Sequence, residues 1–298
     1  MEFIVIQQPI PEIIQKGRCK HFTTKRNSNT YDITIEEDVA RKITISSNDS
    51  PAYEEKLQVF YDLESLLMLF EGQFHSVLHV YENGTEITQS WKSRALPSYE
   101  SADFMKGESN VLLDFSQVLN GRMLTNWRNL QVRLDLIHKM NLYCVSSVRM
   151  PVDMKCAFMI ESFLGIAELL EEKKRITLPV VNDKQSTLKH YIQTTIKAYG
   201  RDIFCQEISK CGTLTNILVN SRNRIAHIKT NQKKVVLDGK ESVMYLMKLS
   251  LLYRKIMFEL LGVSLQTYSS KLAKQVSLID NHEATKLFLQ KLNPKQTK

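Results

Sequence analysis

Cysteine is scarce in this chain and shows none of the spacings that mark a structural site. Five cysteines, an odd number, occur in 298 residues, and no two of them form a Cys-x-x-Cys pair. A disulfide framework needs paired cysteines, and a structural zinc site needs closely spaced ligands. The sequence therefore argues against both and favours a reducing compartment.

Long apolar runs are also missing. No stretch approaches the roughly 18 consecutive apolar residues that span a bilayer as a helix. The chain begins Met-Glu-Phe-Ile-Val-Ile, which lacks the basic region of a signal peptide. We therefore expect a soluble, cytoplasmic protein that has no membrane partner.

The short motifs of several large enzyme classes are absent as well. The chain has no Walker A loop, Gly-x-Gly-x-x-Gly, Gly-x-Ser-x-Gly or His-Glu-x-x-His, so NTPases, dinucleotide enzymes, serine hydrolases and zinc proteases lose their usual signatures. His75 and His79 lie four apart in a strand-like run, about 13 Å from each other. No third ligand is near them in sequence. We expect neither a metal nor a cofactor.

Charge is distributed unevenly along the chain, which has a net charge of +8. Residues 1–148 carry 15 basic and 19 acidic residues, a net of −4, whereas residues 149–298 carry 25 and 13, a net of +12. Lysine and arginine attract phosphates whatever the nucleotide sequence. The C-terminal half is therefore predicted to bind a polyanion such as RNA.

The first ninety residues have the patterns of a small α+β unit. Residues 3–6 form a short apolar run, and apolar residues alternate with polar ones at 31–36 and 43–45, which is typical of strands. A chain of this length commonly holds two domains. We expect this unit to be the first of them.

A helix and a hairpin complete this N-terminal pattern. Ser50 as a cap and Pro51 at the first helical position predict a helix that Gly72 ends. The following strand-like runs, 74–81 and 85–91, flank an Asn-Gly pair, which strongly favours a hairpin turn.

The pattern becomes helical after a stretch rich in Ser, Gly and Pro. It predicts four regions: an α+β domain at 1–92, a linker at 93–110, a helical domain at 111–268 and a C-terminal tail at 269–298. The last residues of the tail, Asn-Pro-Lys-Gln-Thr-Lys, are expected to be disordered.

Three long helices are expected in the helical domain, at 121–145, from Pro151 onward, and at 241–262. The core candidates of the second helix are Met154, Phe158, Phe163 and Leu164. The third helix is apolar around most of its circumference. We expect it at the domain centre or in a dimer interface.

The chain is organised around the segment Ser221 to His227, which has the sequence Ser-Arg-Asn-Arg-Ile-Ala-His and lies in a helix-like run at 214–230. Apolar residues at helical spacing form a stripe along this run: Leu214, Ile217, Leu218, Ile225 and Ile228. Asn223 and His227 fall roughly opposite the stripe, four residues apart. We expect the amide to hydrogen-bond the imidazole and fix its tautomer.

Arg222 is five positions before His227, about 140° away around a regular helix, so the two side chains do not converge by themselves. Three arrangements would bring them together. Arg222 could bend around the helix, the helix could be irregular, or a second copy of the helix could face the first across a two-fold axis.

The Arg-Asn-x-x-x-His pattern on a late helix of an all-helical domain resembles the signature of HEPN ribonucleases. Two further segments resemble the ApeA-like HEPN group: Asn126-Trp127-Arg128, and the apolar run from Phe158 to Leu164 that contains Glu161. This resemblance covers about residues 110–262. It implies an α+β protein in which a small N-terminal unit precedes an all-α HEPN-type bundle, and a homodimer that cuts RNA without metal. The N-terminal unit is shorter than the β-rich region usual in that group.

The resemblance also implies roles for the motif residues. His227 would act as base or acid on the ribose 2′-OH, Arg222 would stabilise charge on the phosphate, and Asn223 would orient them. Only RNA carries that hydroxyl. Glu161 would hold Arg222 or accept a proton from His227, and alternatively it faces water or pairs structurally with an arginine.

Basic residues at and after the motif are candidates for gripping RNA phosphates: Arg224, Lys229, Lys233 and Lys234. A solvated turn is the alternative for the three lysines.

The motif and this resemblance together predict a metal-independent endoribonuclease. The resemblance alone implies its role, a toxin or anti-phage defence effector that halts growth when an antitoxin releases it or a phage-derived trigger activates it. One alternative is a non-catalytic HEPN module that binds RNA or a nucleotide and recruits a partner. Another is a structural interaction protein that uses the apolar 241–262 helix.

Overall fold

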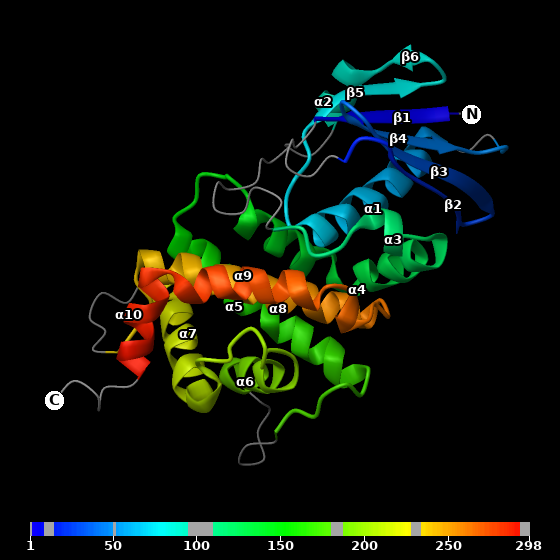
Figure 1. The fold of residues 1–298 in the computed structure, drawn as a ribbon. Coiled ribbons are helices and arrows are strands. Elements are labelled where there is room, and N and C mark those ends of the chain that lie inside the picture. The colour runs from blue at the N-terminus through cyan, green and yellow to red at the C-terminus, as the bar shows by residue number, and fades with distance from the viewer. Residues whose placement is uncertain are drawn as a thin grey trace. The chain divides into compact units, whose positions relative to one another are not determined.

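The computed structural model describes most of the chain: residues 2–8, 15–49, 52–94, 110–179, 187–227 and 234–292. Contacts between residues divide the chain into two compact units. The first unit comprises Met1–Val132 with Ser146–Val148, and the second comprises Arg133–Val145 with Arg149–Lys298. The first contains an antiparallel sheet and the second is helical in its described part, so the fold class is α+β as predicted (Figure 1).

The first unit is built on a six-stranded sheet in the order β2-β3-β4-β1-β5-β6. The strands are β1 (Glu2–Gln7), β2 (Arg18–Arg26), β3 (Asn29–Glu37), β4 (Arg41–Ser46), β5 (Val77–Glu82) and β6 (Thr85–Glu86). Each neighbouring pair is antiparallel. The alternating residues of β3 and β4 meet in register, with Ile33 opposite Ile45 and Ile35 opposite Ile43, and all four are buried. The alternation predicted from the sequence is confirmed.

Helix α1 (Tyr53–Glu71) covers one face of this sheet. The ring of Phe3 in β1 contacts the rings of Tyr53 and Phe60, at centroid distances of 6.0 and 6.2 Å. The helix ends at Gly72 as predicted, because this glycine adopts a left-handed conformation with φ 69°. The predicted cap Ser50 and first residue Pro51 lie outside the described residues.

One strand of this unit was missed, and one prediction for it was wrong. Strand β2 was not predicted, because it is an edge strand whose inward positions include just one apolar side chain, Phe22. The predicted strand at 85–91 ends at Glu86 and is followed by helix α2 (Thr88–Arg94). The hydroxyl of Thr88 accepts the Val80 N–H at 2.9 Å, and the helical turn places Trp91 against Phe60.

The boundary between the units falls at Val132, inside helix α4 (Gly121–Val145), and not in the predicted linker at 93–110. Helix α3 (Phe115–Val118) and the first half of α4 belong with the sheet, since Trp127 Nε1 donates to Ser65 Oγ of α1 at 2.8 Å. Most of the predicted linker, residues 95–109, lies outside the described part of the chain.

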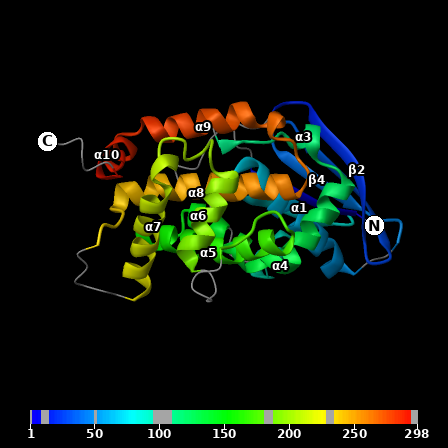
Figure 2. The ribbon, with the colours of Figure 1, turned by 90° about the horizontal axis from the view of Figure 1, so that it is seen from below.

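The second unit is a bundle of helices around α8. Its elements are the second half of α4, α5 (Val152–Glu172), α6 (Leu188–Tyr199), η3 (Ile208–Lys210), α7 (Cys211–Ala226), α8 (Gly239–Leu260), η4 (Leu265–Thr267), α9 (Ser269–Asn281) and α10 (Glu283–Leu292). Helix α8 is buried on nearly all sides and contacts α5, α6, α9 and α10 (Figure 2). Its predicted place at the domain centre is confirmed.

The C-terminal tail predicted from Ser269 is instead two packed helices. Phe288 of α10 contacts the ring of Tyr245 in α8 at 4.6 Å, and the buried ammonium of Lys248 lies 2.6 Å from Asp280 of α9. Because these helices are amphipathic and many of their residues are polar, their apolar positions stand out less than those of α8. The final residues, 293–298, lie outside the described part.

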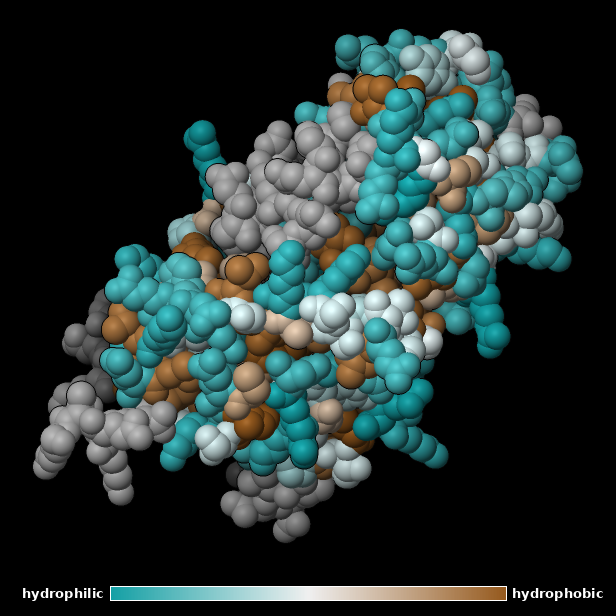
Figure 3. Space-filling model, viewed as in Figure 1, coloured by the Kyte–Doolittle hydropathy of each residue, from teal (hydrophilic) through white to brown (hydrophobic). Residues whose placement is uncertain are grey.

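In the part of the chain that the structure describes, no helix has the length and apolar character to cross a membrane. The face shown in Figure 3 is largely hydrophilic, with smaller hydrophobic areas scattered between the polar side chains.

A buried histidine predicts how the stability of the second unit depends on pH. The His138 ring in α4 is buried, with Nδ1 2.7 Å from the Tyr253 hydroxyl of α8. Burial is the main cause that lowers the pKa of His138 to about 3. In the unfolded chain this histidine has an ordinary pKa of about 6.5. Between about pH 6.5 and 3 it is therefore protonated in the unfolded chain and neutral in the folded chain. This contribution to stability is lost as the pH falls through that window.

We expect the free energy of unfolding to fall between pH 7 and pH 4 by on the order of 3 kcal/mol from this group. The variant His138→Phe should lose less on acidification, although losing the partner of Tyr253 costs about 1–2 kcal/mol at pH 7. Urea unfolding at a series of pH values measures both. His21→Phe, at an exposed histidine of β2, is the control and should match the wild type. An equal acid dependence in His138→Phe and wild type would contradict the account.

Candidate functional site

The motif helix α7 ends earlier than predicted. It spans Cys211–Ala226, with Leu214, Ile217 and Leu218 buried as expected, and it packs against α5 and α6. His227 caps its C-terminus and donates its backbone N–H to the Asn223 carbonyl at 3.1 Å. The imidazole is therefore displayed at an exposed helix end. Residues 228–233, which include the candidates Lys229 and Lys233, lie outside the described residues.

The guanidinium of Arg222 is held by two neighbours. Its Nε donates to Glu161 Oε2 of α5 at 2.7 Å, and its Nη1 donates to Asn223 Oδ1 at 3.0 Å. The Arg222 and Glu161 side chains are 25% and 36% exposed, so water still reaches the pair. Arginine has five N–H donors, and these two bonds leave the others available to a ligand. A pair this accessible adds little to stability, and its main effect is to orient the guanidinium.

Glu161 therefore holds Arg222, which is one of the roles expected for it. Helix α5 supplies the carboxylate and helix α7 supplies the guanidinium, and these two helices pack side by side. Within the part of the chain that is described, no hydrogen bond joins Glu161 to His227.

The hydrogen bond expected between the Asn223 amide and the His227 ring is not formed among the described residues. The side-chain oxygen of Asn223 accepts from Arg222 instead. A charged donor makes a stronger hydrogen bond than a neutral one, so the neighbouring guanidinium outcompetes the imidazole for this oxygen. The His227 ring has no hydrogen bond to any residue that the structure describes.

Among the described residues, no hydrogen bond joins Arg222 to His227. The first is turned toward α5, and the second lies at the end of α7. Bending of Arg222 toward His227 is not observed, and α7 is a regular helix up to Ala226. A second copy facing the first is the arrangement that the structure leaves open.

Of the predicted phosphate-binding residues, the structure describes Arg224 and Lys234. The Arg224 guanidinium lies 3.5 Å from Asp153 Oδ2 in the first turn of α5 and is 41% exposed. Lys234 is exposed in the segment that leads into α8. Both are accessible to a large anionic ligand.

The residues that support this end of α7 were not predicted from the sequence. Ser221 Oγ accepts the Leu237 N–H at 2.8 Å and donates to the Ile217 carbonyl at 2.8 Å. Asp153 accepts from Ser242 Oγ of α8 at 2.6 Å while it faces Arg224. A serine inside the motif and an acidic residue in the first turn of a helix were visible signals, but their partners lie 16 and 89 residues away.

Phe158 was wrongly placed among the core candidates of α5. Phe163 is fully buried and Met154 and Leu164 are half-buried, but the Phe158 side chain is exposed. It lies three residues before Glu161, on the same side of the helix. An apolar ring therefore lies on the surface beside the Arg222–Glu161 pair.

The fold and the site define a helical domain whose paired helices present an arginine held by a glutamate and an asparagine, with a histidine at the helix end. Residues 152–267 match the family described as Apea-like HEPN, a range that contains all of these residues. The match supports an ApeA-like HEPN domain in this part of the chain, in agreement with the resemblance predicted from the sequence. No curated protein and no solved structure matches the chain.

The support that Ser221 gives to the segment after the motif can be measured. Ser221→Ala removes the acceptor of the buried Leu237 N–H, so we expect about 1 kcal/mol lower unfolding free energy and faster amide exchange at Leu237. Asn220→Ala is the matched control, because the neighbouring Asn220 amide makes only an exposed bond of 3.4 Å to the Val235 carbonyl. Unchanged exchange at Leu237 in Ser221→Ala would contradict the assignment.

Proposed function

We propose that this protein is a metal-independent endoribonuclease of HEPN type. HEPN domains are commonly endoribonucleases, and the match of residues 152–267 to this family supports the proposal. The observation that carries the proposal is the Arg222 guanidinium, which Glu161 and Asn223 orient while several of its N–H donors stay accessible. A preorganised cation of this kind is suited to stabilise negative charge that develops on a phosphate.

The proposed reaction needs one group that moves a proton and one that stabilises charge. His227 takes a proton from the ribose 2′-OH or gives one to the leaving oxygen, because imidazole suits proton transfer near neutral pH. Its exposed place at the end of α7 lets it reach a bound strand. Arg222 faces the phosphate, with Asn223 and Glu161 as its positioning residues.

We propose that the working site forms in a homodimer through the HEPN domain. Arg222 and His227 diverge within one chain, so a second motif helix across a two-fold axis would supply the missing group. The exposed ring of Phe158 beside the ion pair offers apolar area for such an interface. Arg224 and Lys234, with Lys229 and Lys233, would bind the flanking phosphates of RNA.

The biological role follows from the family and is proposed on that basis. A ribonuclease of this type would act as a toxin or anti-phage defence effector in the cytoplasm, kept inactive until an antitoxin is removed or a phage-derived trigger arrives. The first unit, which lies outside the matched range, is the proposed place for that control.

One observation favours a second candidate, a HEPN module that binds RNA or a nucleotide without cutting it. Among the described residues, Asn223 accepts a hydrogen bond from Arg222 and makes none to the His227 ring. A histidine without a fixed tautomer is a weaker catalyst, whereas the basic surface would still bind phosphates.

The proposal is tested by incubating the purified protein with total RNA and a defined tRNA in excess EDTA. We expect cleavage that leaves 2′,3′-cyclic phosphate ends. His227→Ala should reduce the rate at least about 100-fold, on the ordinary scale of general acid-base catalysis, and Arg222→Ala should abolish cleavage while both variants remain folded.

Two matched controls should retain full activity. Arg133→Ala breaks another arginine–glutamate pair of the second unit, the exposed pair with Glu172, and His21→Ala removes an exposed histidine of β2. RNA binding without cleavage by the wild type and by both motif variants would favour the binding module and overturn the ribonuclease.

A further inference from the structure

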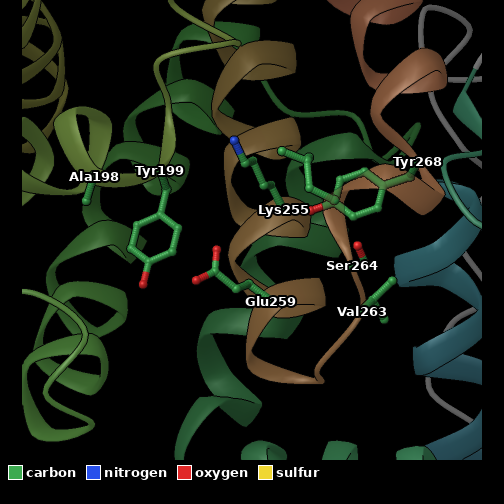
Figure 4. Close-up of a pocket in the computed structure, with 8 residues that line it drawn as sticks. Ala198, Tyr199, Lys255, Glu259, Val263, Ser264 and Tyr268 are labelled. Carbon is green, nitrogen blue, oxygen red and sulfur yellow. The ribbon is translucent and has the colours of Figure 1, made fainter.

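A cavity of about 320 Å³ lies beside the C-terminal part of α8, formed by residues outside the motif (Figure 4). Helix α6 contributes Tyr199, α8 contributes Lys255 and Glu259, and the segment after α8 contributes Tyr268 with apolar residues. A volume of this size is at the lower end for sites of small molecules. The polar groups in its wall decide which molecule fits.

The carboxylate of Glu259 has no ion-pair partner among the described residues. Lys255 is four residues earlier on the same face of α8, the spacing at which an ion pair usually forms. Its ammonium lies 2.6 and 2.7 Å from the two carboxylate oxygens of Asp202 instead. Figure 4 shows the Lys255 amine pointing away from Glu259. The three groups therefore leave one net negative charge, which is located at Glu259.

Two tyrosines lie on either side of this carboxylate. The Tyr199 and Tyr268 side chains are largely buried in the wall, and Figure 4 shows Glu259 between them. Burial first, and the charge of Glu259 second, raise the pKa of both hydroxyls, while Arg175 outside the wall acts oppositely on Tyr199. The hydroxyls therefore stay protonated, and the negative field of Glu259 reaches both sides of the pocket.

We propose that this pocket binds a small organic cation, a primary alkylammonium whose charged end pairs with Glu259 between Tyr199 and Tyr268. Its apolar part lies against Val263 and Leu265. An ammonium makes a charge-assisted hydrogen bond to a carboxylate, and the tyrosine rings attract a cation through their faces. An anion is disfavoured, because the ammonium of the wall is already engaged by Asp202.

The test compares three probes of equal size on the full chain: n-butylammonium, n-butanol and butyrate. Backbone amide shifts of Val263, Ser264 and Leu265 in two-dimensional NMR report binding beside the pocket. We expect saturable shifts with n-butylammonium at a Kd in the millimolar range, which is typical of so few atoms. Butanol should bind about tenfold more weakly, and butyrate should cause no saturable shift.

Glu259→Gln keeps the shape of the side chain and removes its charge, so it should weaken n-butylammonium binding about tenfold or more. Glu168→Gln, at an exposed glutamate of α5 outside the pocket, is the matched control and should bind like the wild type. Equal binding of butanol, undiminished binding by Glu259→Gln, or no saturable shift with n-butylammonium would each overturn the proposal. This result is independent of whether the protein cuts RNA.

Discussion

Helix α8 is apolar around most of its circumference, and the second unit is arranged to remove it from water. Helices α5, α6, α9 and α10 contact it from several sides. Even its charged residues follow this constraint, since the ammonium of Lys248 is fully buried and lies 2.6 Å from both Glu207 and Asp280. Breaking such a buried pair leaves an uncompensated charge, so α9 is tied to α8 by electrostatics as well as by packing.

The candidate site follows from this packing. Because α5 packs on α8 and also on α7, the carboxylate of Glu161 meets the guanidinium of Arg222. The ion pair is open to water, and an exposed pair contributes about 0–1 kcal/mol to stability. Its value to the protein is therefore the direction in which Arg222 points. Among the described residues, the Arg222 guanidinium is held by Glu161 and Asn223 and makes no hydrogen bond to His227.

Strongly periodic elements could be predicted from the sequence. Helix α4 has the bounds expected from its pattern, α5 begins just after Pro151, and the Asn-Gly turn joins β5 to β6. Strand β2 and helices α9 and α10 could not be predicted from the sequence, because each is stabilised by the element it packs against. A mostly polar edge strand is held by pairing with β3, and an amphipathic helix is held by the surface of α8.

The candidate site too could be predicted from the sequence only in part. The motif identified α7, because Arg222, Asn223 and His227 are close in sequence. Whether Asn223 hydrogen-bonds Arg222 or His227 depends on side-chain geometry, and the spacing of residues in the sequence does not predict that geometry. Ser221 and Asp153 were missed for a related reason, since their hydrogen-bond partners come from the segment before α8 and from α8 itself.

We propose that the 2′-hydroxyl of RNA is the group that attacks the phosphate. The most direct measurement uses an RNA oligonucleotide that the protein cuts, beside the same oligonucleotide with one 2′-deoxy nucleotide on the 5′ side of the cut. We expect this single change to block cleavage at that position in excess EDTA, while the oligonucleotide still binds, because the attacking ribose hydroxyl has been removed. Cleavage of the deoxy-substituted position at an equal rate would contradict it.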